Sequence, residues 1–188
     1  MDVLFATSNK NKFAEALVAI ERETGGAIHL KQYPFQHTEI RSDSLEEIAR
    51  EAAGSAHSAC KGPVFVEDSG LFIDALDGFP GTYSGWVQKK IGNRGILRLL
   101  EGKADRRAHF EACIAFHDGK KISVFRGRCD GTIAEGEAGT SGFGYDPIFV
   151  PAGHSQTFAQ SIGLKNKISH RYLALLEFSK SNVLRHKD

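Results

Sequence analysis

The stretch "VLFATSNKNKF" (residues 3–13) joins an apolar segment to a polar turn and then to a helical pattern. Its apolar start, residues 3–6, is typical of a short buried strand. Ser8 or Asn9 can cap a helix that runs over about residues 10–23. A strand that leads through a tight turn into a helix is typical of α/β proteins, and this stretch therefore indicates the fold class.

The turn "TSNKNK" (residues 7–12) contains two hydroxyls, two amides and two lysines, a composition that fits an anion-binding site. The free N–H groups and the dipole at the start of a helix favour phosphate. Thr7 and Asn9 add hydrogen-bond donors, and Lys12 adds a positive charge about one turn into the helix. A capped helix with solvated lysines explains the same residues, so the turn alone leaves both interpretations open. The glycine pattern of a P-loop is absent, which argues against a Walker site.

Periodicity, caps and turn residues predict the remaining elements. We expect strands at 27–33 and 63–68, helices at 44–60, 84–101 (interrupted at Gly92) and 166–180, and a hairpin of 107–117 with 120–128. A capping box of Ser44 and Glu47 opens the helix at 44–60, Asp118-Gly119 forms the hairpin turn, residues 69–81 are rich in turns, and a glycine-rich loop covers 136–144. The alternation of strands and helices in the first part of the chain and the central hairpin together predict an α/β protein with a mixed sheet, not a purely parallel one.

Length and composition are those of an ordinary globular protein. The 188 residues suggest a single domain over residues 1–188, or two lobes that share one core. A net charge of +1 provides no long-range basic field, so we expect no nucleic-acid partner. No apolar run reaches transmembrane length and no signal peptide is indicated, so we expect no membrane partner. Three widely spaced cysteines (Cys60, Cys113 and Cys129) fit a reducing cytoplasm.

The stretch "VEDSG" (residues 66–70) places two carboxylates at the end of an apolar strand, which is a common ligand position in α/β sheets. Adjacent strand residues point to opposite faces, so Glu67 and Asp68 face one site only if the strand has ended. Asp68 is nearer the loop and is the better candidate. Mg²⁺ takes oxygen ligands and is often held by one or two carboxylates and phosphate oxygens. Glu39 is the second candidate ligand, although taken alone it fits a surface acid better.

Two later segments contain further candidate binding residues. In "GTSGFGYDPIF" (139–149), glycines let the backbone approach a ligand, and Phe143 and Tyr145 offer flat faces for a base. The same aromatics also fit a tight turn into a core strand. In "LKNKISHRYLALLEF" (164–178), Arg171 near a helix start can donate to a carbonyl or a phosphate, but a lone His-Arg pair more often marks an exposed helix face.

Taken in order, these motifs resemble the inosine-triphosphate pyrophosphatases, the Ham1-like family that acts on non-standard purine nucleotides. The family's T-x-N-x-x-K matches Thr7, Asn9 and Lys12, and its acidic strand end matches "VEDSGLFIDALDGFPG". Its F-G-[WY]-D-P matches "FGYDP" at 143–147, and its K-N-x-x-S-H-R matches residues 165–171. The motifs run in order from residue 7 to residue 171, so the resemblance covers nearly the whole chain.

The resemblance implies a fold, a reaction and a set of site residues. It implies an elongated mixed sheet flanked by helices, two lobes around a central cleft, and a homodimer. It also implies hydrolysis of ITP, dITP and XTP to the monophosphate and pyrophosphate, with Mg²⁺ as cofactor. Asp68 is then the catalytic residue and, with Glu39, a metal ligand. The substrate-binding residues are then Thr7, Ser8, Asn9, Lys10, Asn11, Lys12, Ser69, Phe143, Gly144, Tyr145, Asp146, Lys165, His170 and Arg171.

Base selection is expected to depend on Arg171, which donates but never accepts a hydrogen bond. Hypoxanthine and xanthine carry a carbonyl at position 6, where adenine carries an amino group. Two rival functions stay open. One is a Maf-like pyrophosphatase for pyrimidine or modified nucleotides, against which the FGYDP and SHR segments argue. The other is a non-catalytic nucleotide-binding or RNA-binding protein, against which the ordered carboxylates and the near-zero net charge argue.

Overall fold

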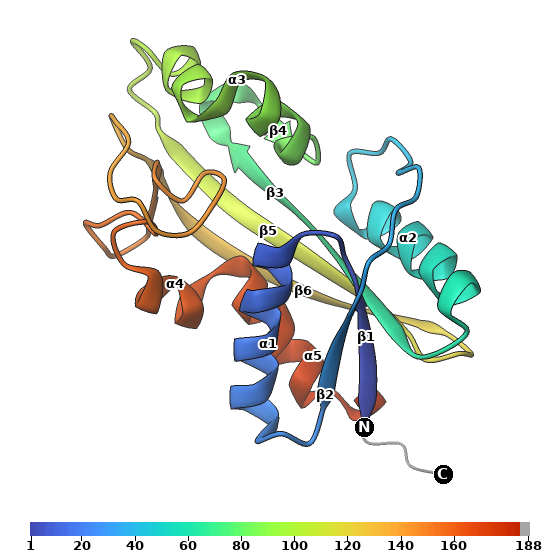
Figure 1. Ribbon diagram of the computed structural model, residues 1–188. Helices are drawn as coiled ribbons and strands as arrows, with labels where there is room; N and C mark the ends of the chain where they lie inside the picture. The colour runs from blue at the N-terminus through green and yellow to red at the C-terminus, as the bar shows by residue number, and fades with distance from the viewer. Residues whose placement is uncertain (185–188) are drawn as a thin grey trace. The chain divides into compact units, whose positions relative to one another are not determined.

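A computed structural model describes residues 1–184, and within them the chain is a mixed α/β protein (Figure 1). Its elements are β1 (Asp2–Ala6), α1 (Lys10–Thr24), β2 (His29–Tyr33), α2 (Leu45–Cys60), β3 (Val64–Ile73), η1 (Asp74–Leu76), β4 (Pro80–Gly81), α3 (Ser84–Leu99), β5 (Arg107–His117), β6 (Ile122–Ile133), β7 (Phe149–Pro151), α4 (Ile162–Ile168), α5 (His170–Lys180) and η2 (Asn182–Leu184). In this part of the chain no helix is both long and apolar enough to cross a bilayer.

The described strands form one seven-stranded sheet in the order β2-β1-β3-β5-β6-β7, with β4 paired to β3. Strand β1 runs parallel to both of its neighbours, β2 and β3, whereas β4 and β7 run antiparallel to β3 and β6. The predicted mixed sheet is therefore confirmed. The turn of the β5–β6 hairpin is also as predicted, because the Asp118 carboxylate accepts from the backbone N–H groups of Lys120 and Lys121 at 2.7 and 2.8 Å.

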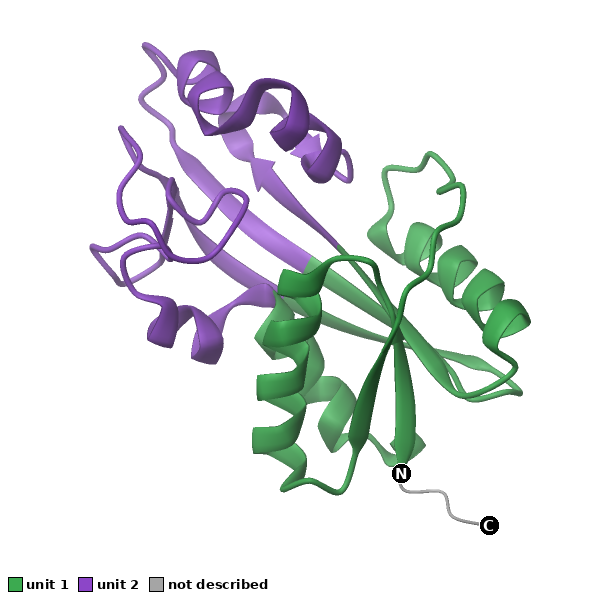
Figure 2. Cartoon of the chain, in the orientation of Figure 1, with its two compact units in different colours: residues 1–68, 112–127, 171–188 green, residues 69–111, 128–170 purple. Residues whose placement is uncertain are grey.

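The chain divides into two compact units, each built from separate stretches of sequence (Figure 2). Unit 1 comprises residues 1–68, 112–127 and the described part of 171–188, and unit 2 comprises residues 69–111 and 128–170. Strands β3, β5 and β6 each continue from one unit into the other. Each unit also has a hydrophobic core of its own.

The core of unit 1 is centred on aromatic rings from β1, β3 and α5. Phe5 stacks on Phe65 with ring centroids 4.4 Å apart, and Phe178 packs against Phe65 at 5.1 Å. All three side chains are fully buried. Burying an aromatic side chain of this size contributes about 1.5–3 kcal/mol, so these rings fix how the central strands and the last helix of unit 1 pack.

Three predicted elements have wrong boundaries: the hairpin strand expected at 120–128, which runs as β6 over Ile122–Ile133, the strand expected to end at Asp68, and the helix expected at 166–180. The strand expected to end at Asp68 continues as β3 to Ile73, because Leu71 and Phe72 pair with β4 and the side chains of Leu71 and Ile73 are buried. The helix expected at 166–180 is two helices, α4 and α5. Ser169 between them has an extended backbone (φ −66°, ψ 155°), which interrupts the helical hydrogen bonding.

The capping box predicted for α2 is only half formed. Ser44 accepts from the backbone N–H of Glu47 at 3.3 Å, as predicted. The Glu47 carboxylate, however, accepts from the hydroxyl of Ser42 at 2.6 Å, and the Ser44 N–H donates to that same Ser42 oxygen at 3.0 Å. Ser42 therefore takes the role that the motif assigns to the glutamate.

Candidate functional site

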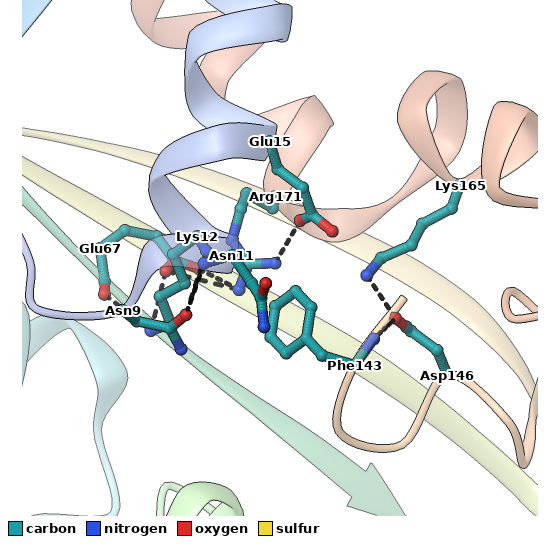
Figure 3. Close-up of polar contacts among 9 residues, drawn as sticks. All are labelled: Asn9, Asn11, Lys12, Glu15, Glu67, Phe143, Asp146, Lys165 and Arg171. Carbon is teal, nitrogen blue, oxygen red and sulfur yellow. Dashed lines mark hydrogen bonds and ion pairs between the residues drawn. The ribbon is translucent and has the colours of Figure 1, made fainter. Parts of the chain in front are cut away.

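The turn between β1 and α1 is organised by the side chain of Asn9. Its Oδ1 accepts from the backbone N–H groups of Asn11 and Lys12 at 3.0 and 3.2 Å, which makes Asn9 the N-cap (Figure 3). The hydroxyl of Thr7 in turn accepts from the Asn9 N–H at 3.1 Å. Because the cap uses the oxygen of the amide, the other end of the Asn9 side chain is the Nδ2 group, which only donates. The turn is thus rigid and rich in donors, as an anion site requires.

Behind this turn lies a buried ion network within unit 1. The Nζ of Lys12 lies 2.9 Å from Oε2 of Glu67 and also donates to the Glu67 backbone carbonyl at 3.1 Å. Arg171 donates to Oε2 of Glu15 at 2.6 Å and lies 3.1 Å from Oε1 of Glu67 (Figure 3). The Glu67 and Arg171 side chains are only 1% and 4% exposed. In these contacts each carboxylate faces at least one cation, so the buried charges compensate one another.

The network fixes the charge state of Arg171. Burial by itself would lower the pKa of its guanidinium group. The carboxylates of Glu67 and Glu15 outweigh this effect and raise that pKa above its ordinary value. Arg171 is therefore a permanent cation held by two acids of α1 and β3.

A second group of predicted residues meets within unit 2. The Nζ of Lys165 lies 2.6 Å from Oδ2 of Asp146, and both side chains are almost fully buried. The same Oδ2 accepts from the backbone N–H of Phe143 at 2.7 Å, and the Lys165 ammonium lies 4.4 Å from the centre of the Phe143 ring. Figure 3 shows Lys165 and Phe143 meeting at the Asp146 carboxylate. This pair thus holds residues 139–149, which include Phe143 and Tyr145 and are called the aromatic loop below, in one conformation.

The loop depends on a glycine at position 142. Gly142 has φ +75°, a backbone conformation that other residues adopt rarely. A Cβ atom there would lie 2.2 Å from the Asp146 Oδ2. Only glycine leaves room for the carboxylate at this position of the glycine-rich loop, and the approach of the loop backbone to a ligand stays a prediction.

Residues 3–181 match the sequence model of the Ham1 family. The chain belongs to the Ham1 family. It is 46% identical over 180 residues to a dITP/XTP pyrophosphatase from Thermococcus kodakarensis, which covers 95% of this chain and 96% of the relative. A dITP/XTP pyrophosphatase from Pyrococcus horikoshii is 43% identical over 179 residues, with 95% of each chain covered. The resemblance found in the four motifs is thereby confirmed.

Solved Ham1 structures have the same fold. The Ham1 protein of Staphylococcus aureus matches with a TM-score of 0.81 at 31% identity, and that of Coxiella burnetii matches with 0.82 at 30% identity. Both comparisons cover 95% of this chain and 96% of the other. The α/β fold with a mixed sheet that the sequence predicts is therefore the fold of the Ham1 family.

The predicted metal ligands of this Ham1 chain lie on two different kinds of segment. Asp68 is half-buried on β3, and Glu39 is exposed in the loop between β2 and α2. Within residues 1–184 there is no group of three or more His, Cys, Asp or Glu side chains arranged to hold a metal. A metal held by Asp68 and Glu39 would need further oxygen ligands, such as those of water, backbone carbonyls or a substrate.

Two predicted ligand-binding side chains are buried among neighbours of unit 2. Tyr145 is in the hydrophobic core, where its hydroxyl donates to the Ser84 carbonyl at 3.0 Å and burial raises its pKa. His170 stacks on Phe110 with ring centroids 4.5 Å apart. For Tyr145 the structure thus matches the core interpretation that the sequence left open. Phe143, half-buried, is the more accessible of the two aromatics in the loop.

The remaining predicted residues lie on the surface or close to it. Ser8, Lys10 and Asn11 are exposed on the turn and the first turn of α1, and the Ser8 hydroxyl donates to the Phe35 carbonyl at 3.1 Å. Ser69 is half-buried on β3 and Gly144 has φ +63° in the aromatic loop. Their assignment to substrate binding stays a prediction.

Sequence reasoning missed Glu67 and Glu15, the two acids of the ion network. It set Glu67 aside because strand alternation turns it away from Asp68. That alternation holds, since β3 continues past both residues, and it is what directs Glu67 into the interior. Glu15 follows Lys12 by three positions on α1, so the two lie on one helix face. This spacing was the available signal for a charge pair behind the turn.

We predict that Lys165→Met lowers the free energy of unfolding of this Ham1 chain by about 3–5 kcal/mol, because it removes one partner of a buried ion pair. Urea unfolding measures the change. The double variant Lys165→Met/Asp146→Asn should recover part of the loss, because the buried negative charge is then gone as well. Lys167→Met, on the exposed side of the same helix, is the control and should have little effect. A single variant as stable as this control would contradict the prediction.

Proposed function

We propose that this chain hydrolyses non-standard purine nucleoside triphosphates of the ITP, dITP and XTP type to the monophosphate and pyrophosphate, and so removes them from the nucleotide pool. The observation that carries the proposal is the donor-rich turn at residues 7–12, capped by Asn9 and followed by Lys12. Its support is the name dITP/XTP pyrophosphatase carried by relatives 46% identical over nearly the whole chain.

The triphosphate is proposed to bind at the turn of residues 7–12. The Thr7 hydroxyl and the Nδ2 group of Asn9 donate to phosphate oxygens, and Lys12 supplies a positive charge. Glu67 lies 2.9 Å from the Lys12 ammonium, so the position of the lysine side chain is fixed before a phosphate binds. A site that is ordered in advance loses less conformational entropy on binding, which favours affinity.

The purine is proposed to bind at the loop around Phe143. The ring of Phe143 stacks on any purine and adds affinity without selecting the base. Lys165, Asp146 and His170 complete the substrate-binding set that the family motifs assign. Arg171 is proposed to donate to the carbonyl at position 6, which adenine lacks. A purine that leaves a buried donor unsatisfied loses about 1–3 kcal/mol, or roughly ten- to a hundredfold in affinity.

The chemical step is proposed to depend on Asp68. Its carboxylate would orient a water molecule toward the α-phosphorus and accept a proton from it as pyrophosphate leaves. Glu39 and Asp68 fit Mg²⁺ by the chemistry of their donors, since this ion takes carboxylate oxygens together with phosphate oxygens. When bound, the ion would neutralise negative charge on the phosphates. We also propose a homodimer and a cytoplasmic location, from the family resemblance and the widely spaced cysteines.

A panel of nucleoside triphosphates tests the proposed function. Activity is followed as orthophosphate released after addition of inorganic pyrophosphatase. We expect hydrolysis of ITP, dITP and XTP, much weaker hydrolysis of ATP and GTP, no orthophosphate without the added enzyme, and loss of activity in excess EDTA. Preference for pyrimidine or modified nucleotides would favour the Maf-like alternative. Binding without turnover would favour a non-catalytic nucleotide-binding protein.

We predict that Asp68→Asn lowers kcat by on the order of a hundred- to ten-thousandfold while nucleotide binding persists. The change is nearly isosteric but removes a charge that orients water and binds the metal. Steady-state kinetics and calorimetric titration of dITP measure the two effects. Asp77→Asn is the control, because this aspartate is exposed and undergoes the same chemical change. A variant at position 68 with near-normal turnover would show that Asp68 has another role.

We predict that Asn9→Asp separates substrate binding from folding. Aspartate caps a helix as well as asparagine does, and its charge is favourable at a helix N-terminus, so stability should not fall. The Nδ2 donors are replaced by an anionic oxygen that repels phosphate, so the KM for dITP should rise roughly tenfold or more. Asn9→Ser keeps the cap without the charge and should give an intermediate KM. Unchanged KM in both variants would exclude Asn9 as a phosphate donor.

A further inference from the structure

A side chain of α3 holds the backbone of the aromatic loop within unit 2. Gln88 Nε2 donates to the carbonyl oxygen of Gly144 at 2.8 Å, although the two residues are 56 positions apart in the sequence. A carbonyl oxygen only accepts, so this contact fixes which end of the Gln88 amide faces the loop. Nothing in the family motifs assigns a role to Gln88.

The interruption of α3 at Gly92 contributes to the same contact. Gly92 has φ 61° and ψ −167°, a combination that is essentially restricted to glycine. Across this break, Gln88 Nε2 also donates to Oδ1 of Asn93 at 3.3 Å, and Asn93 Nδ2 donates to Oε2 of Glu137 at 3.4 Å. Residues on both sides of the break thus bond to the segment that contains the aromatic loop.

The hydrogen bond from Gln88 fixes the backbone of Gly144, the residue that follows Phe143. Gly144 has φ +63°, and a Cβ built there would meet no atom within 4 Å, so no packing on that side holds this residue in place. On its far side, the Tyr145 hydroxyl is bonded to the carbonyl of Ser84, at the start of α3. On its near side, the Phe143 N–H is bonded to Asp146. The Gln88 bond therefore fixes the peptide group between two anchored aromatics.

One end of the Gln88 amide lowers the stability of the folded chain. Oε1 of Gln88 is buried and has no hydrogen-bond partner among the described residues. An unsatisfied buried acceptor destabilises the folded chain, and an apolar side chain of similar length would avoid that penalty. Positions that break a local rule in this way are often functional ones.

We infer that Gln88 is a positioning residue for the nucleobase: through the Gly144 carbonyl it holds Phe143 in the orientation that stacks on a purine. The inference rests on the proposed function and adds a residue of α3 to it. Gln88 does not touch the base in this scheme, and it acts only through the loop.

The test compares Gln88→Met with Gln88→Lys. Methionine keeps the length of the side chain but removes the donor, whereas lysine, whose side chain is one atom longer and flexible, restores an N–H donor. Lys89→Met, exposed on the same helix, is the matched control. For each variant we measure amide hydrogen exchange of residues 136–148 without nucleotide, the unfolding midpoint in urea, and kcat and KM for dITP and dATP.

We expect Gln88→Met to speed exchange in the loop and to raise the KM for dITP roughly three- to tenfold, the value of one hydrogen bond. The kcat should change less, and the unfolding midpoint should fall only slightly, because removal of the unsatisfied acceptor offsets part of the loss of the bonds to Gly144 and Asn93. Gln88→Lys should restore most of the wild-type KM. A purely structural residue would instead lower stability and leave KM unchanged.

Other outcomes overturn the inference. Unchanged loop exchange in Gln88→Met would show that Gln88 does not hold the loop. Faster exchange with an unchanged KM, in an active wild-type protein, would show that the loop position does not matter for the base. If the wild-type protein hydrolyses none of the nucleotides, the proposed function fails, and loop exchange then decides whether Gln88 holds the loop.

Discussion

The buried carboxylate of Glu67 is the constraint on which the arrangement of unit 1 depends. A carboxylate that is 1% exposed is tolerated only beside positive charge, because removing it from water costs several kcal/mol. That charge comes from Lys12 on α1 and Arg171 on α5. The requirement to compensate one acid therefore brings together three segments that are far apart in the sequence. It also places the Lys12 ammonium behind the turn capped by Asn9.

Local signals explain which parts of the fold were predictable. Asn9 and Ser44 open helices, and Asp118-Gly119 closes a hairpin, because side chains within three residues satisfy the backbone groups concerned. The end of β3 was not predictable in this way. Residues 69–73 follow two acids and begin a turn-rich stretch, and they stay extended because Leu71 and Phe72 pair with β4 and because Leu71 and Ile73 are buried. The break at Ser169 likewise has no glycine or proline to announce it.

The candidate site, like the fold, could be predicted only in part from the sequence. Its motif residues could be predicted because their types and order are distinctive, but their surroundings could not. The sequence of a glycine-rich loop is the same whether its aromatic side chains face solvent or the core. In the structure, the burial of Tyr145 and its bond to the Ser84 carbonyl show that this side chain is internal. Glu67 and Glu15 carry no motif, and their importance appears only when β3, α1 and α5 are packed.

The contact between position 142 and the Asp146 carboxylate has a consequence for how the gene can vary. A Cβ at residue 142 would lie 2.2 Å from a buried oxygen that already bonds Lys165 and the Phe143 backbone. Every first- or second-base change in a glycine codon introduces a side chain or a stop. Neutral drift at this codon is thus confined to its third base, and a nucleotide alignment of close relatives should show synonymous variation alone at this position.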